Sequence, residues 1–221
     1  MSNAELPRTE ETRVTRIPEK QVFDRAALYA LLDDAIVGHV AVLRGEQPIV
    51  LPVGIGRDGD TLLIHGSTGS GIFRELADGR PLSIAVTLVD GLVYARSAFE
   101  SSIHYRSAVI MGHAEKVEGD EKLAAVAILT NHMMPGRWDE VRETTKKELA
   151  ATMVLRVPLD RVSVKVSNKG PDEFEDDGDD RSIWAGVLPL RVVAGKPYAS
   201  EMTPEGTPIS PSVIAQQQRL V

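Results

Sequence analysis

Short runs in which hydrophobic and polar residues alternate fill most of the chain, and turn residues separate them. The alternation predicts strands over residues 36–43, 48–55, 61–65, 82–88, 92–96, 108–117, 152–157 and 161–166. The pairs Asp58-Gly59 and Asp90-Gly91 lie between neighbouring runs and predict tight hairpin turns. A parallel sheet would need a helix after nearly every strand, and these turns leave no room for one. The pattern therefore predicts a mainly β, antiparallel barrel with peripheral helices.

Helical spacing of apolar residues predicts those helices. Asp24 is a candidate N-cap for a helix that runs through Leu32. Further helices are expected over residues 71–77, 121–132 and 138–149. The chain divides into a polar, mobile arm (1–20), a single domain (21–199) with an acidic loop (171–181), and a tail (200–221) that is expected to be poorly ordered.

Composition narrows the class of function. Of the 221 residues, 43% are hydrophobic, which is enough for a sizeable core, and the net charge of −7 gives no basic field for nucleic acid or an acidic membrane. The absence of cysteine excludes disulfides, iron–sulfur clusters and thiol catalysis. The five histidines show no paired helical spacing, so no metal site is predicted. Without a signal peptide or an apolar span, a cytoplasmic protein that binds no membrane is expected.

The segment 62–76 contains the strongest candidate for chemistry. It predicts a strand, a glycine-serine turn over 66–71 and a helix start, an arrangement that suits phosphate. Ile72 and Phe73 stand where a P-loop has Lys and Ser or Thr, and Arg74 stands where a dinucleotide fingerprint needs a third glycine. Nucleotide hydrolysis and Rossmann-type binding are therefore excluded. A phosphate site and an ordinary strand-to-helix turn both remain open.

Two further features have two interpretations each. Arg106 and Ser107 lie in the segment 97–107, which is expected to link two strands, and they are suited either to clamp a phosphate or to occupy the surface. Trp184, in the apolar segment 184–190, is suited either to core packing or to covering a planar ligand or a partner subunit.

Taken together, several stretches resemble one known family. They are His65–Gly71, Asp90–Ser97, Tyr105–Ser107, Gly112–Ala114, Glu148-Leu149 before a Thr-x-Val-Leu strand, and Trp184–Leu190. The chain resembles the pyridoxamine 5′-phosphate oxidase-related, FMN-binding split-barrel proteins from about Phe23 to Tyr198, and is most similar to the flavin-nucleotide-binding or nitroimidazole-resistance-like branch. The resemblance implies a six-stranded antiparallel split barrel that forms a homodimer with FMN at the interface.

Carried over by position, the resemblance also implies which residues bind the cofactor. Leu51, Pro52, Val53 and Gly54 would lie along the flavin ring. Ile64, His65, Gly66 and Ser67 would pass the ring and ribityl chain. Thr68, Gly69, Ser70 and Gly71 would meet the phosphate, with Arg106 and Ser107 beside it and Trp184 at the flavin edge.

The chain departs from true oxidases at the turn. Ser70-Gly71-Ile72 replaces their Arg-Lys phosphate clamp, and the C-terminal arginine motif that holds the vitamin substrate has no counterpart. The positive charge is then expected from Arg74, Arg106 or the helix dipole, and vitamin B6 is not the expected substrate. We expect an FMN-dependent oxidoreductase that uses a small-molecule substrate or a reduced nicotinamide donor. The alternatives are a non-catalytic flavin store or sensor, and a split-barrel binder of haem or deazaflavin.

Overall fold

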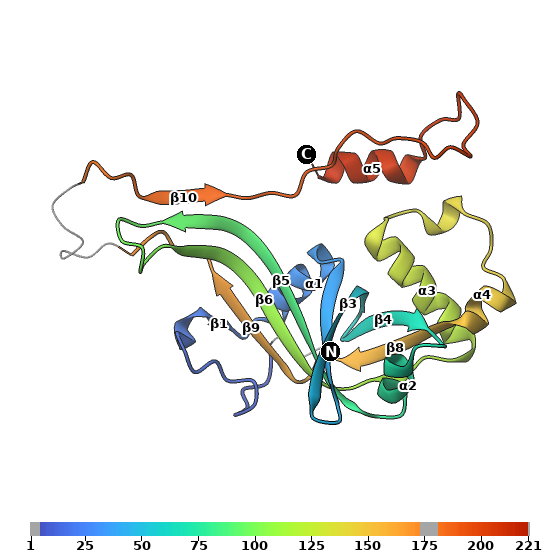
Figure 1. Ribbon diagram of the computed structural model, residues 1–221, viewed down its shortest axis with the longest axis horizontal. Coiled ribbons are helices and arrows are strands. Elements are labelled where there is room, and N and C mark those ends of the chain that lie inside the picture. Colours follow the sequence, from blue (N-terminus) through green and yellow to red (C-terminus); the bar gives the residue numbers. More distant parts are fainter. Residues whose placement is uncertain (1–4, 173–180, 221) are drawn as a thin grey trace.

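Antiparallel strands dominate the structure, a computed structural model that describes residues 5–172 and 181–220 (Figure 1). Ten strands form one hydrogen-bonded sheet in the order β1-β9-β6-β5-β2-β3-β4-β8-β7, and β10 pairs with β5. The strands are β1 (Gln21–Val22), β2 (Val37–Arg44), β3 (Gln47–Asp58), β4 (Thr61–Ser67), β5 (Pro81–Tyr94), β6 (Ser102–His113), β7 (Glu115–Lys116), β8 (Thr152–Pro158), β9 (Val162–Ser167) and β10 (Gly186–Pro189).

Six of these strands close into a barrel. β6, β5, β2, β3, β4 and β8 are successive neighbours in the sheet. β6 ends at His113, and the chain continues through Ala114 into β7, which pairs with β8 and returns the sheet to its start. The prediction of a mainly β, antiparallel split barrel is confirmed. The sheet has ten strands rather than six because β1, β9 and β10 extend it and β7 continues β6.

The helices are α1 (Arg25–Asp34), α2 (Gly71–Ala77), α3 (Gly119–Met133), α4 (Lys146–Ala151) and α5 (Pro211–Arg219), with 3-10 turns η1 (Pro18–Lys20) and η2 (Trp138–Glu140). The inner faces of the barrel strands and parts of α1 and α2 form the main core, in which Leu28, Ile64 and Ile84 are completely buried. Each such side chain stabilises the fold by roughly 1.5–3 kcal/mol. Asp24 caps α1 as predicted, because its carboxylate accepts the amide of Ala26 at 2.9 Å.

Helix α3 lies against the outer face of the barrel. Leu63 and Val154 point outward from β4 and β8 and pack with Ala125 and Leu129 in a second, smaller core. A Cβ atom on Gly56 of β3 would lie 3.2 Å from Leu129 Cδ2, so this glycine allows the helix to lie close to the strand. The predicted turn begins where β4 ends, at Ser67. The outer face of β3 and β4, beneath α3, therefore lies next to this turn.

Three local predictions differ from the structure. Asp90-Gly91 does not form a hairpin; β5 continues through it with a register shift between Val89 and Gly91, because β6 and β10 both pair with the far end of β5. Half of the expected link 97–107 is already strand, since β6 starts at Ser102. The expected helix 138–149 is divided into η2 and α4, because the Thr145–Glu148 capping box begins a new helix.

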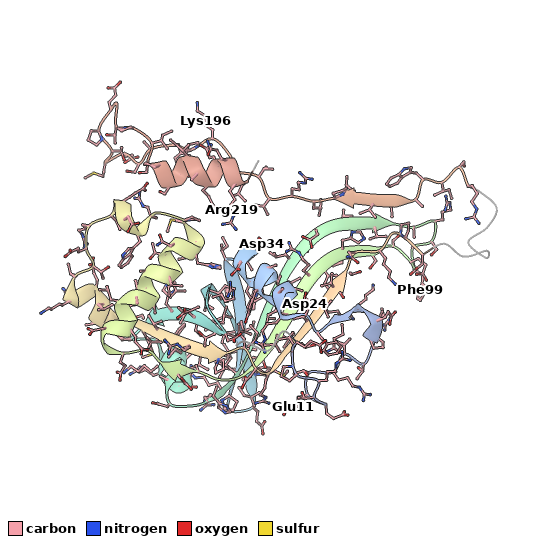
Figure 2. All side chains as sticks on the ribbon, turned by 180° about the vertical axis from the view of Figure 1, so that it is seen from behind. Glu11, Asp24, Asp34, Phe99, Lys196 and Arg219 are labelled. Carbon is pink, nitrogen blue, oxygen red and sulfur yellow. The ribbon has the colours of Figure 1, made fainter. Side chains whose placement is uncertain are left out.

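The two terminal segments also differ from expectation. Residues 211–219 form α5 rather than a poorly ordered tail. Ser212 in its first turn donates to Glu140 of η2, and Arg219 at its end lies 3.9 Å from Asp34 at the end of α1 (Figure 2). In the expected arm, Leu6 is buried in the main core. Most of the acidic loop 171–181 lies outside the described residues, and the domain limits of 21 and 199 stay a prediction.

Candidate functional site

The glycine-serine turn follows β4 directly and is fixed by its own hydrogen bonds. Ser67 Oγ accepts the amide of Gly69 at 3.1 Å, and Ser70 caps α2 by accepting the amide of Phe73. The amide of Thr68 donates to the carbonyl of Ala151 at 3.0 Å, which ties the turn to the start of β8. The serine hydroxyls are thus partly used within the turn. The amides of the first turn of α2 have no partner inside the helix, as at any helix start.

Two guanidinium groups flank this turn. Arg74 Nη2 donates to the carbonyl of Gly69 at 3.5 Å, so one of the cations expected to serve a phosphate is at the turn. Arg44 Nη2 lies 2.9 Å from the position that a Cβ atom on Gly71 would take, and it pairs with Glu75 at 3.1 Å. Sequence reasoning missed Arg44, because it lies at the end of β2, far from the turn in sequence.

Two residues of the predicted site also serve the packing of the core. Ile64 is completely buried among the core side chains, so only its backbone is available to a cofactor. A Cβ atom on Gly66 would lie 2.6–2.8 Å from three carbons of the Phe73 ring. The packing of Phe73 therefore requires a glycine at position 66, and the place of Gly66 beside the flavin ring and ribityl chain stays a prediction.

His65 has the most unusual environment of the predicted residues. Its ring lies over Gly54, where a Cβ atom would be 3.2 Å from His65 Cε1 and 3.4 Å from the sulfur of Met133. His65 Nδ1 is buried and has no hydrogen-bond partner. Burial lowers the pKa of His65 below its ordinary value, so the imidazole is neutral at pH 7. A neutral ring with an unsatisfied nitrogen can bind a metal or exchange a hydrogen bond with a ligand.

The predicted segment 51–54 has two faces. Leu51 and Val53 are half-buried, and Val53 packs against the core, whereas Pro52 and Gly54 alternate with them on the outer side of β3. The structure therefore brings Pro52, Gly54 and His65 to the same outer surface, beside the turn.

Arg106 and Ser107 lie elsewhere and are engaged. Arg106 forms two hydrogen bonds with Asp90, at 2.9 and 3.0 Å, and one with Asp34 at 2.7 Å. These carboxylates raise the pKa of Arg106. Ser107 donates to the carbonyl of Lys165. Within this chain, these interactions leave the clamp role of Arg106 and Ser107 without support.

Trp184 is also remote from the turn within one chain. It is 64% exposed, and its ring lies 5.8 Å from that of Tyr94, centroid to centroid, at the far end of β5. In Figure 1 this end of β5, with β10, is opposite to α2. A role at the flavin edge would therefore require a partner subunit and stays a prediction.

No group of three or more His, Asp or Glu suited to a metal ion occurs among residues 5–172 and 181–220. No helix in these ranges has the length and apolar character needed to cross a bilayer.

A closed antiparallel barrel, extended by further strands and with a strand-to-helix turn beside its outer surface, defines the class of split barrels. The sequence profile of the pyridoxamine 5′-phosphate oxidase family matches residues 24–166, so the chain belongs to that family. No curated protein matches the chain.

Solved structures extend the comparison. The chain is 43% identical to an FAD and haem binding protein from Mycobacterium smegmatis, with a TM-score of 0.85 over 89% of this chain and 96% of that one. It is 29% identical to the flavocytochrome Anf3 from Azotobacter vinelandii, with a TM-score of 0.87 over 96% of this chain and 98% of that one. A protein assigned to 5-nitroimidazole antibiotic resistance in Bacteroides thetaiotaomicron shares the fold, at 23% identity and a TM-score of 0.56 over 66% of this chain and 86% of that one.

The family profile and the match to Anf3 cover different lengths of this chain. The family profile ends at residue 166, whereas the match to Anf3 covers 96% of the chain and so includes most of residues 167–221. Most of the C-terminal segment that follows residue 166 is therefore shared with the flavocytochrome and is not part of the family profile.

Proposed function

We propose that this protein is a flavin-binding redox protein whose flavin phosphate lies at the turn 67–71. The observation that carries the proposal is the 43% identity, over nearly the whole of both chains, to a protein that binds FAD and haem. The expected FMN and the FAD of that relative share the ring, the ribityl chain and the first phosphate. The same residues would therefore hold either form.

The residues at the outer surface fit such a group. Arg74 and the first amides of α2 would hold the phosphate, and a planar ring would lie against exposed Pro52 and the His65 ring, which covers Gly54. His65, neutral and with an unsatisfied Nδ1, would exchange a hydrogen bond with the ligand. When bound, a flavin supplies the electron-transfer chemistry, and the chain supplies binding, orientation and electrostatics.

A visible spectrum of the purified protein with added FMN or FAD tests the proposal. Bound flavin that NADH or NADPH bleaches, and that air reoxidises, would assign an oxidoreductase with a nicotinamide donor. Bound flavin that neither donor reduces would favour a store or sensor. A protein that binds neither flavin would refute the proposal.

Haem is a second candidate ligand. The observation that favours haem is the unsatisfied Nδ1 of His65. Histidine is a common axial ligand of haem iron, and the two similar structures are a haem binding protein and a flavocytochrome. We expect haem titration to give a Soret band whose position changes in His65→Ala. The matched control is His113→Ala, since His113 is an exposed histidine at the end of β6. A spectrum unchanged by His65→Ala would exclude His65 as the ligand.

A homodimer is the third part of the proposal. One row of exposed residues crosses four neighbouring strands on the outer face: Pro52 on β3, His39 on β2, Ala85 on β5 and Val109 on β6. Val50, beside this row on β3, is 58% exposed. A largely apolar sheet face of this kind is typical of a subunit interface.

Light scattering of the purified protein tests the dimer. We expect twice the chain mass for the wild type and a shift towards the monomer for Val50→Asp, which would place a charge in the interface. A monomeric wild type at micromolar concentration would refute this part.

A further inference from the structure

A cavity adjoins the turn, with Thr68 in its lining. Its volume is about 470 Å³, and it lies where the end of β4, α2, the start of α3 and the start of β8 meet. Its lining includes Thr68, Arg74, Lys116, Lys122, Ala150 and Met153. Thr68 belongs both to this cavity and to the turn, so a ligand whose phosphate lies at the turn can continue into the cavity.

The cavity is locally positive in a chain of net charge −7. Lys116 is neutralised by Glu118, whose carboxylate lies 2.6 Å from Lys116 Nζ. Neither Arg74 nor Lys122 forms an ion pair with any residue in 5–172 or 181–220, while the lining contains one further carboxylate, that of Asp78. Three cations therefore face two carboxylates, and half-buried Lys122 is available to an anion.

The cavity lining also contains apolar side chains. Ala77 and Ala150 lie in the lining, and Met153 belongs to the main core with 6% of its surface exposed. Methionine is polarizable and packs well against aromatic rings. A lining that contains both cations and apolar side chains suits a phosphate joined to an aromatic base.

We propose that this cavity binds the adenosine phosphate half of FAD, an inference that rests on the flavin site proposed above. The flavin phosphate at Gly69 and Arg74 would be followed by the second phosphate at Lys122 and by the adenine against Ala150 and Met153. The volume lies within the range of about 300–1,000 Å³ of small-molecule sites. The chain would then prefer FAD to FMN, although both present the same ring to His65.

Titration of the apoprotein with FAD and with FMN, followed by flavin fluorescence, tests this assignment. We expect Lys122→Gln to weaken FAD binding by about tenfold or more, the effect of losing a hydrogen bond to a charged group. FMN binding should change by less than about twofold. Arg74→Gln should weaken both flavins, because Arg74 serves the phosphate that they share.

The matched control is Lys20→Gln, since Lys20 is a half-buried lysine in η1, outside the cavity. Lys116→Gln gives a second test if Lys122→Gln lowers expression, and circular dichroism checks the fold of each variant. The cavity assignment is overturned if Lys122→Gln affects FAD and FMN equally, or affects neither. It is also overturned if the substitution weakens NADPH binding and leaves FAD unchanged, because the cavity would then serve a nicotinamide dinucleotide. A wild type that binds neither flavin overturns the flavin site itself as well.

Discussion

Replacing Gly66 with alanine tests directly whether this glycine serves packing. The new methyl group would lie 2.6 Å from a carbon of the Phe73 ring, whereas ordinary contacts begin at 3.4 Å, so the ring must move by about 0.8 Å. Phe73 is 6% exposed and belongs to the main core, so it has little room to move. Overpacking of this kind costs about 1–3 kcal/mol.

Urea unfolding measures that cost. With a slope of about 2–3 kcal/mol per molar, a loss of about 2 kcal/mol lowers the midpoint by about 0.7–1 M. Gly66→Ala combined with Phe73→Leu removes the ring carbons that clash, so the two changes should destabilise by less than the sum of their separate effects. Additive effects, or a Gly66→Ala midpoint equal to that of the wild type, would show that the packing argument is wrong.

Three further changes separate the other roles. Arg106→Ala should lower the melting temperature, because the substitution leaves Asp90 without its cation. Flavin affinity should stay within about twofold of that of the wild type. A large loss of flavin affinity would return Arg106 to the phosphate site. Hydrogen bonds from Ser212 lower the pKa of Glu140, so the contact that holds α5 is intact above about pH 4.5 and is lost as the pH falls further. An NMR titration that follows the chemical shift of the Ser212 amide measures this loss. An amide shift that stays constant down to pH 3 would contradict the prediction. Thr145→Ala removes the cap of α4 and should cost about 0.5–2 kcal/mol in thermal unfolding, whereas Thr145→Ser should cost little.

The sequence predicted the barrel because its signals are local. Alternation places Leu62 and Ile64 on one face of β4, and both are in the core. Asp24 was predicted to cap the first long helix, and it does so. Where two signals competed, the prediction failed: Asp90-Gly91 has hairpin residues, but pairing with β10 keeps the strand continuous.

The site was predictable in outline and not in detail. The turn after β4 could be located, but the purpose of Gly66 depends on Phe73, whose ring returns to it only after α2 forms. Arg106 has the right chemistry for a phosphate, yet its charge is satisfied by Asp34, which is 72 residues away in sequence. Lys116 and Lys122 carry no motif, because only the packing of α3 against β8 brings them next to Thr68. Long-range proximity of this kind leaves no pattern in a single sequence.

The closure of the barrel has a mechanical consequence. β5 and β6 are joined by twelve residue pairs, but β7 and β8 are joined by only two, Glu115 with Arg156 and Lys116 with Leu155. The closure is therefore a weak seam of the ring, comparable to the three pairs that join β2 and β5, and transient separation of β7 from β8 would break few hydrogen bonds. Lys116 belongs to this seam and also lines the cavity beside the turn. Breathing at the seam would thus widen the cavity without unfolding the barrel, which gives a bulky ligand a route in and out.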